Sequence, residues 1–452
     1  MKIVYLAAGA ADMYCGSCLH DNTLAAALAA LGEDVLLVPT YTPLRTDEEN
    51  VSDAHLFFGG VNVFLQQHSA IFRHTPWFID ALLNHPGFIS WITKGGASVE
   101  AERLGGLTVS MLQGEHGRQR KEVRKLVYWL KNEARPDVVH LSNAMLVGVA
   151  REIGSLGIPV LATLSGEDNF LEKLPQPFYD QARAVLRERA ADVDVFVAMN
   201  RYYADFMADY LDVPPARIHV IPHGLNLAGH GTRSLAPGEP RTIGFLSRIC
   251  PDKGLHNLVA AAELLLADPE MPPFRVRAAG YLGRLDRPYL ETIQKRTMRW
   301  SKPDAFEYAG ELTRAQKIAF LQSLDVMSLP TVYRESKGLA VFEALANGVP
   351  VVLPEHGAFP EVVKQTGGGL LHRPDDPAAL AEALRRLLVD PRLGWELGSR
   401  GQQAVQRDFT AAGMAEKTLK LYRETQAAGR KATPEGFAER RDTPATSHPR
   451  PG

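Results

Sequence analysis

The feature that most restricts the fold of this chain is the segment 333–348, which contains two glutamates, Glu335 and Glu343, on either side of Gly338. Residues 325–330 before it are short and apolar and end in a proline, which is typical of a buried strand. From Gly338 onward the residues favour a helix, and an Asn-Gly pair followed by a proline predicts its end. The pattern therefore predicts a strand, a loop with Glu335 and a helix that contains Glu343.

The start of this predicted helix suits a phosphate group. Gly338 and Leu339 would leave backbone amides unpaired at the positive end of the helix dipole. Glu335 and Glu343 repel a phosphate, but they can accept hydrogen bonds from hydroxyl groups on either side of it. A ligand in which hydroxyl groups flank a phosphate in this way is a sugar nucleotide.

Two cations follow another predicted strand, which ends near residue 247. Arg248 and Lys253 lie in a loop with a proline and a glycine, between that strand and the next predicted helix. Arg248 offers a planar fork and Lys253 a point charge, so together they could hold a diphosphate without a metal ion. Taken alone, two such cations are more often solvated surface charges. Together with the glutamate segment they favour a diphosphate site.

These residues resemble the retaining GT-B glycosyltransferases, a family that includes many mannosyl- and glucosyltransferases and, more distantly, the glycogen synthases. Segments 220–226, 306–312 and 357–363 are similar to further family segments, although His223 stands where the family usually has asparagine. The resemblance covers most of residues 1–425 and is strongest over 220–375. It implies an α/β protein of GT-B architecture, with two Rossmann-like domains whose parallel sheets face a deep interdomain cleft.

The resemblance also implies an activity, the retaining transfer of a sugar from a nucleotide diphosphate sugar to a hydroxyl group of a saccharide, lipid or small molecule. Glu335, Arg248 and Lys253 are the expected catalytic residues, with Glu335 on a hydroxyl of the donor sugar. The same three residues are expected to bind the donor, together with Gly16, Ser17, Leu312, Gly338, Leu339 and Glu343, the last on the ribose. Beyond this co-substrate, no cofactor and no metal ion are expected.

The sequence departs from the family after the predicted strand 160–164, where relatives commonly have a histidine. Here Ser165 follows, which can hydrogen-bond a sugar hydroxyl but cannot act as a charged partner. Glu167 and Asp168 could bind the acceptor, because ligands bind at the carboxyl ends of parallel strands, or they could cap the next helix. The departure leaves two alternatives open: a catalytically silent protein that binds sugar nucleotides, and a sugar-nucleotide epimerase or hydrolase.

Short apolar runs alternate with helical patterns in both halves of the chain, which predicts parallel sheets covered on both faces. The expected strands are 3–8, 35–39, 138–142, 160–164 and 195–199 in the first half, and 242–246, 275–279, 306–309, 326–329, 349–353 and 369–371 in the second. Helices are expected between them, the first at 24–31.

We expect an N-terminal acceptor domain over residues 1–226, with an inserted helical region at about 41–130. A linker rich in glycine and proline at 227–241 leads to a C-terminal nucleotide-sugar domain at 242–408. A helix over 409–426 crosses back to the N-terminal domain, as the resemblance implies. The tail 427–452 has almost no apolar residues and is predicted to be disordered.

Composition excludes several classes of protein. The 452 residues are 45% hydrophobic and 23% charged, with a formal net charge of −2, so no overall field attracts nucleic acid. We find no apolar run long enough to span a membrane and no signal peptide, and we expect a cytoplasmic protein. The basic cluster 118–125 could make weak peripheral membrane contact, but interleaved glutamates favour a solvated helix face. The oligomeric state is left open.

Three further patterns are weaker. Cys15 and Cys18 form a C-x-x-C that could indicate redox chemistry or half a zinc site, but Cys250 stands alone as the third cysteine. Asp192 and Asp194 match a D-x-D metal motif, yet they begin a predicted strand, which favours a structural role. Aromatic residues crowd the segment 57–91, which favours the core of an inserted subdomain over a platform for an acceptor.

Overall fold

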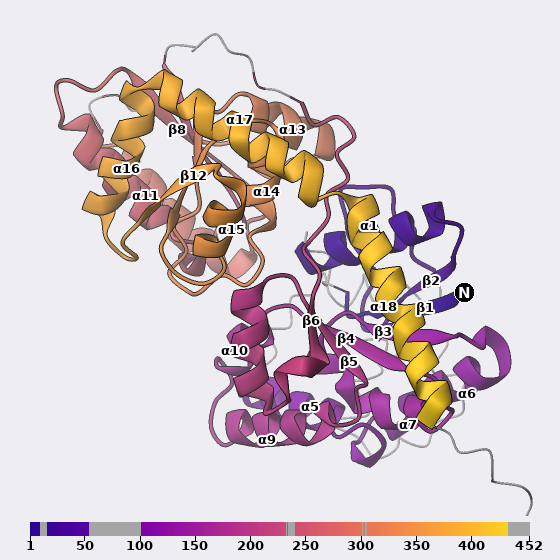
Figure 1. Ribbon diagram of the computed structural model, residues 1–452. Helices are drawn as coiled ribbons and strands as arrows, with labels where there is room; N and C mark the ends of the chain where they lie inside the picture. The colour runs from indigo at the N-terminus through magenta and orange to yellow at the C-terminus, as the bar shows by residue number, and fades with distance from the viewer. Residues whose placement is uncertain are drawn as a thin grey trace, which may run out of the picture.

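The computed structural model describes residues 1–9, 16–53, 101–231, 233, 240–300, 302 and 305–432. These residues form two α/β units, each built on a six-stranded sheet (Figure 1). Every strand pair in both sheets is parallel, which confirms the predicted fold class. We call the unit that contains the first sheet the N-terminal domain and the other the C-terminal domain.

The sheet of the N-terminal domain has the strand order β2-β1-β3-β4-β5-β6. Its strands are β1 (Lys2–Ala7), β2 (Asp34–Pro39), β3 (Val138–Leu141), β4 (Val160–Leu164), β5 (Val195–Ala198) and β6 (Ile218–Val220). The central strands are almost continuously apolar because helices cover both faces, and all five residues of β4 are buried. The short strand β6 was not predicted.

Alternate residues of β1 show how the two faces are covered. Ile3 and Tyr5 pack with α1 (Gly16–Ala30) and α18 (Ala411–Ala432), whereas Val4 and Leu6 pack with the helices on the opposite face. Those helices and short helical turns are α5 (Ala101–Leu112), α6 (Arg120–Trp129), η3 (Leu130–Ala134), η4 (Ala144–Val149), α7 (Ala150–Gly154), α8 (Glu167–Leu171), α9 (Phe178–Ala190) and α10 (Arg201–Leu211). The short turns η2 (Gly114–His116) and η5 (Pro215–Arg217) complete the domain.

The sheet of the C-terminal domain has the order β12-β11-β10-β7-β8-β9. Its strands are β7 (Arg241–Leu246), β8 (Phe274–Ala279), β9 (Phe306–Tyr308), β10 (Val326–Ser328), β11 (Val351–Pro354) and β12 (Gly369–His372). The helical elements are η6 (Pro251–Lys253), α11 (Leu255–Leu266), η7 (Arg284–Asp286), α12 (Arg287–Thr297), α13 (Arg314–Gln322), α14 (Leu339–Ala346), α15 (Phe359–Thr366), α16 (Pro377–Val389) and α17 (Pro391–Asp408). The central position of β7 and β10 brings the two predicted phosphate-binding loops side by side.

The last helix, α18, leaves the C-terminal domain after α17 and lies along the N-terminal domain beside α1 (Figure 1). Its Tyr422 is fully buried there, with its hydroxyl group 2.5 Å from Nδ1 of His140 on β3. The helix continues to Ala432, so the predicted disorder is wrong for residues 427–432. Residues 433–452 lie outside the described part of the chain.

Two other expectations differ from the structure or lie outside it. Helix α1 begins at Gly16, eight residues before the predicted start, so Gly16 and Ser17 lie at the N-terminus of this helix. The aromatic segment 57–91 and Cys15 lie outside the described residues, and the described part of the expected insertion shows helices at 101–130. Among the helices that are described, none combines the length and apolarity needed to cross a bilayer.

Candidate active site

Glu335 lies in the loop between β10 and α14 and is the centre of a buried polar cluster. Its Oε2 accepts hydrogen bonds from Lys253 Nζ at 2.7 Å and from the Tyr333 hydroxyl at 2.6 Å, and Lys253 also contacts that hydroxyl. Its Oε1 accepts from the backbone amides of Ser336 and Lys337, at 3.1 and 3.2 Å. The side chain is therefore fixed in position before any ligand binds.

The electrostatic environment keeps Glu335 ionised. Burial alone would raise the pKa of this carboxyl group, but the charge and hydrogen bond of Lys253, then Tyr333 and Lys337, lower the pKa to about 2. The same contact has the opposite effect on Tyr333, since burial and the neighbouring carboxylate raise the pKa of its hydroxyl group. Tyr333 thus stays a neutral donor between a cation and an anion.

The loop that holds Lys253 contacts the loop that holds Glu335. The amide of Val332 donates to the carbonyl group of Asp252 at 3.0 Å, which brings the two predicted motifs together. Arg248, in the same loop as Lys253, is exposed and makes a hydrogen bond from Nε to Cys250 Sγ at 3.4 Å. Within the described residues no carboxylate lies within ion-pair distance of Arg248. Its charge is therefore available to an anionic ligand.

The N-terminus of α14 is open, as the sequence predicts. Gly338 has a left-handed backbone, with φ of 69°, and neither it nor Leu339 donates its amide to a backbone acceptor in the described chain. Leu339 also faces the N-terminal domain, because a Cβ atom at Gly16 would lie 3.6 Å from its side chain. The starts of α14 and α1 therefore approach each other across the two domains.

Lys337 is a site residue that the sequence analysis missed. Its Nζ donates to Ser17 Oγ at 2.6 Å, and no described carboxylate lies within ion-pair distance of it. Ser17 belongs to the first turn of α1, so the lysine bridges the two domains beside the open amides of α14. The lysine directly precedes the glycine that starts the helix, and this was the only signal in the sequence that could have indicated its position.

Glu343 lies inside α14, as the sequence predicts, and its side chain is buried. Its Oε1 is 2.5 Å from Lys317 Nζ of α13, and the same ammonium group is 2.5 Å from a carboxylate oxygen of Asp47 in the N-terminal domain. Burial would lower the pKa of Lys317, but Glu343 and Asp47 raise it above its ordinary value. The sequence analysis included neither Lys317 nor Asp47.

Leu312 lies in the turn between β9 and α13 and packs partly buried against the core of the C-terminal domain. The helix after it begins with a capping box formed by Thr313 and Gln316, which fixes the turn. Leu312 thus directly precedes the helix that contains Lys317, the residue that pairs with Glu343.

The loop after β4 reaches the same region from the N-terminal domain. A Cβ atom at Gly166 would lie 3.3 Å from Ser336 Oγ, so Ser165 and Gly166 adjoin the loop of Glu335. Asn200, the N-cap of α10, donates from Nδ2 to the carbonyl group of Ser336 at 2.7 Å. Two elements of the N-terminal domain thus contact the segment that precedes α14.

Glu167 and Asp168 have internal partners instead of facing an open site. Glu167 accepts hydrogen bonds from the amides of Ala144 at 2.9 Å and Ser165 at 2.8 Å, and Asp168 accepts one from the Tyr203 hydroxyl at 2.7 Å. Both carboxylates are buried, and α8 begins at Glu167 with Gly166 as its N-cap. They belong to α8 itself and do not cap a later helix, and their partners lie within the N-terminal domain. Ser165 directly precedes Gly166, the residue that approaches Ser336.

The remaining sequence motifs have structural partners. Asp192 pairs with Arg151 Nε at 3.1 Å, and Asp194 accepts a hydrogen bond from the amide of Val160 at 2.7 Å. Cys18 and Cys250 are both buried. Within the described residues no group of three or more histidine, cysteine or acidic side chains is arranged to hold a metal ion.

A buried histidine pair lies where the first domain ends, and the sequence analysis had noted only one of its members. Nδ1 of His20 on α1 is 2.7 Å from Nδ1 of His223 in the segment after β6. Burial, followed by the charge of Lys337, lowers the pKa of His20 to about 3, and burial lowers that of His223 as well. Both imidazoles are therefore neutral near pH 7 and add no charge to the site.

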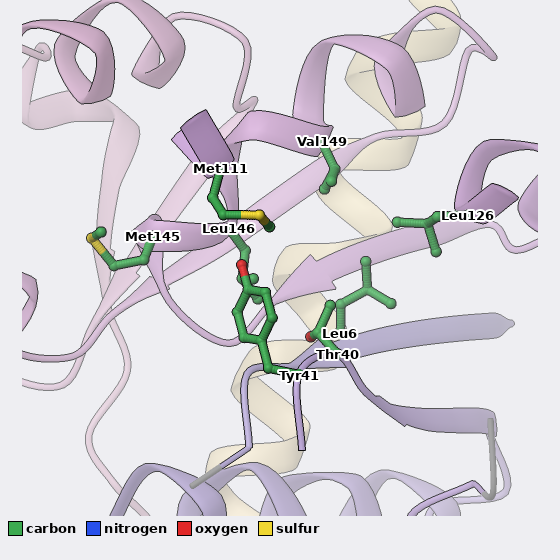
Figure 2. Close-up of a pocket in the computed structure, with 8 residues that line it drawn as sticks. All are labelled: Leu6, Thr40, Tyr41, Met111, Leu126, Met145, Leu146 and Val149. Atoms are coloured by element: carbon green, nitrogen blue, oxygen red, sulfur yellow. The ribbon is translucent and has the colours of Figure 1, made fainter. Parts of the chain in front are cut away.

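A small cavity in the N-terminal domain is lined by apolar side chains, with Tyr41 and Met111 pointing into it (Figure 2). Its other lining residues are Leu6, Thr40, Leu126, Met145, Leu146 and Val149. The free volume is about 10 Å³, which is roughly the room that one water molecule needs. This cavity is therefore too small to hold a sugar or a nucleotide.

Two family models match the chain, one in each half. Residues 22–228 match Glycosyltransferase Family 4, and residues 232–404 match Glycosyl transferases group 1. The D-inositol 3-phosphate glycosyltransferase of Corynebacterium efficiens is 29% identical over 55% of this chain and 61% of its own length. The alpha-maltose-1-phosphate synthase of Mycolicibacterium smegmatis is 27% identical over 66% of this chain and 81% of its own length. A glycogen synthase of Mycobacterium tuberculosis is 25% identical over 89% of both chains.

Solved structures show the same fold. A sucrose-phosphate synthase from Thermosynechococcus elongatus superimposes with a TM-score of 0.70 at 18% identity, covering 95% of this chain and all of the other. The Anabaena protein HepE in complex with UDP-glucose gives a TM-score of 0.63 at 16% identity, covering 94% and 100%. With both halves matched and the two parallel sheets in place, the chain belongs to the group 1 glycosyltransferases and has the GT-B fold.

Proposed function

We propose that this protein transfers a sugar from a nucleoside diphosphate sugar to a hydroxyl group, with retention of configuration at the anomeric carbon. The observation that supports the proposal most strongly is Glu335, held ionised by Lys253 and Tyr333 beside the open N-terminus of α14. The relatives named above are glycosyl-transferring enzymes, and HepE binds UDP-glucose, which agrees with a nucleotide-sugar donor.

In this proposal the donor lies across the start of α14. The amides of Gly338 and Leu339 bind the diphosphate, together with Arg248 and Lys337, which have no carboxylate partner among the described residues. Lys253 contributes its charge from the opposite side while it holds Glu335. Glu343 accepts hydrogen bonds from the ribose, and the turn with Leu312 adjoins the base. Gly16 and Ser17 close the site from the first turn of α1.

The chemistry follows from this placement. Cations and amides neutralise the charge that develops on the leaving diphosphate, and the fixed carboxylate of Glu335 stabilises positive charge at the anomeric carbon. Because Lys253, Tyr333 and two amides already occupy Glu335, we do not assign it as a covalent nucleophile. The acceptor hydroxyl attacks from the face that the diphosphate leaves, and a departing phosphate oxygen takes its proton. Ser165 hydrogen-bonds the acceptor or the donor sugar.

The proposal is tested by incubating the protein with UDP-, GDP- and ADP-sugars, with and without a panel of hydroxyl acceptors. Chromatography detects the products, and NMR determines the anomeric configuration of any new glycoside. We expect two products, a nucleoside diphosphate and a glycoside, and we expect them only when an acceptor is present. The anomeric configuration of the glycoside should be the same as that of the donor. Free sugar, an epimerised donor, an inverted product or binding without turnover would each contradict the proposal and identify a different function.

A further inference from the structure

One loop of the N-terminal domain, residues 44–49 after β2, contacts the C-terminal domain through three charged pairs. Arg45 Nη2 lies 2.7 Å from Glu311 Oε1, Asp47 Oδ2 lies 2.5 Å from Lys317 Nζ, and Glu48 Oε1 lies 3.2 Å from Arg314 Nη1. All three partners lie in the turn before α13 or on α13. We call residues 44–49 the acidic loop.

The three pairs differ in their exposure to solvent. The side chains of Asp47 and Lys317 are 7% and 10% exposed, whereas those of Arg45 and Glu311 are 40% and 31% exposed. A buried ion pair is screened little by salt, and an exposed one contributes little free energy. The side chains of Glu48 and Arg314 are 8% and 19% exposed, so this pair is also mostly buried. The Asp47–Lys317 and Glu48–Arg314 pairs are therefore the contacts of this loop that contribute most free energy, and of the two only Lys317 also contacts Glu343.

Helix α1 fixes the acidic loop within its own domain. Thr23 Oγ1 donates to Glu48 at 2.8 Å, and Asn22 Nδ2 donates to the carbonyl group of Glu49 at 2.9 Å. Asn22 also accepts a hydrogen bond from the amide of Val51 at 3.0 Å. These bonds hold the loop against α1, so its carboxylates reach the C-terminal domain from a rigid base.

Lys317 connects this loop to the proposed ribose site. Its ammonium group is shared between Asp47 and Oε1 of Glu343, each at 2.5 Å, and three N–H groups allow it to bond both. Among the described residues no hydrogen-bond partner is found for Oε2 of Glu343, which leaves this oxygen for a ligand hydroxyl. The contact between the domains and a bound ribose can therefore exist at the same time.

We propose that Lys317 is a positioning residue that orients Glu343 toward the ribose, and that Asp47 fixes Lys317 from the other domain. The affinity for the nucleoside then depends on Asp47, although this residue belongs to the domain opposite the proposed nucleotide site. This inference rests on the proposed function, because it assumes that Glu343 binds the ribose of a donor.

Asp47→Asn in the full-length protein tests the inference. The amide keeps the shape of the side chain and the Lys317–Glu343 pair, so the fold should be retained. Calorimetric titration should show UDP binding weakened by roughly 5- to 50-fold, the range typical of coupling between sites. Binding of inorganic pyrophosphate, which has no ribose, should change by less than about twofold. Arg45→Ala is the matched control, and loss of this exposed pair should change UDP binding by about twofold or less.

A double-mutant cycle with Glu343→Gln shows whether the effect passes through Glu343, and Asp47→Asn should then weaken UDP binding far less in that background. Unchanged UDP binding in Asp47→Asn, equal losses of UDP and pyrophosphate, or fully additive effects in the cycle would each overturn the inference. A wild-type protein that binds none of UDP, GDP and ADP would overturn the proposed function together with it. Normal wild-type binding with an unaffected Asp47→Asn variant would overturn only the inference.

Discussion

At the scale of single residues, Glu335 and Glu343 have different partners, which predicts different roles. Glu343 should contact the ribose, remote from the reacting carbon, so Glu343→Gln should mainly raise KM and weaken binding of the product nucleotide. Glu335 lies where positive charge develops, so Glu335→Gln should lower kcat by at least ~10-fold with nucleotide binding nearly unchanged. Steady-state kinetics and calorimetry of both variants measure this. If Glu335→Gln weakens nucleotide binding and Glu343→Gln lowers kcat instead, the donor lies across the site in the opposite orientation.

Glu335 should also contribute to stability in a pH-dependent way. Its folded pKa of about 2 lies below the ordinary value of 4.5, so this stabilisation is complete above about pH 4.5 and is lost as the pH falls toward 2. The shift corresponds to about 3 kcal/mol. Calorimetric melting of wild type and Glu335→Gln should show a gap in Tm at pH 5 that narrows as the pH is lowered to 3. A gap that stays constant would show that the carboxylate is not held ionised by Lys253.

The sequence could predict residues whose roles depend on local pattern, and it missed those defined by distant partners. Arg248, Lys253, Glu335 and Glu343 could be selected as candidates because each follows a recognisable strand or glycine, and their roles stay predictions. Lys317 and Asp47 were missed because their roles depend on a contact between positions 270 residues apart. Local pattern also did not indicate the partners of Glu167, whose carboxylate accepts hydrogen bonds from amides of its own domain.

At the scale of elements, the strand pattern was largely predictable because the buried parallel strands are almost continuously apolar. All eleven predicted strands overlap observed ones, and among the strands of the described residues only the three-residue β6 was missed. The starts of helices were harder to predict. Helix α1 begins at Gly16 with polar residues that are buried by contacts from elsewhere in the fold, so its first turns lack the apolar pattern of a surface helix.

The N-terminus of α14 should be sensitive to substitution of its glycine. Gly338→Ala would place a Cβ atom in a left-handed backbone and 3.1 Å from the ring of Phe359. We expect a loss of stability of about 1–2 kcal/mol and at least ~10-fold weaker pyrophosphate binding, because the amides that face the phosphate would shift. Thermal melting and calorimetry measure the two effects.

Gly32 offers a matched control for this substitution. It also has a left-handed backbone, with φ of 87°, but a Cβ atom there would meet nothing within 4 Å. Gly32→Ala should destabilise the protein through the same backbone strain and leave pyrophosphate binding unchanged. If both variants bind pyrophosphate normally, the start of α14 is not a phosphate site.

At the scale of the whole molecule, the site depends on contacts between the two domains. Lys337 bonds Ser17, Asn200 bonds the backbone of Ser336, and Asp47 bonds Lys317, so both sides of the site contain residues from the opposite domain. Helix α18 is a second covalent connection between the domains, because the chain runs through it from the C-terminal domain back to the N-terminal domain (Figure 1). The resemblance of the sequence to a family can predict that two domains form the site, but only the three-dimensional structure identifies the residue pairs between them.

The central claim, a diphosphate site built from cations and helix amides, is tested most directly by calorimetric titration of UDP, GDP and ADP in excess EDTA. We expect at least one nucleotide to bind with the metal removed, and Arg248→Ala to weaken that binding by at least ~10-fold, the cost of a charge-assisted hydrogen bond. Arg400→Ala, which removes an exposed arginine on α17, should bind as wild type does. Binding that requires magnesium or manganese, or that is unchanged in Arg248→Ala, would contradict the account.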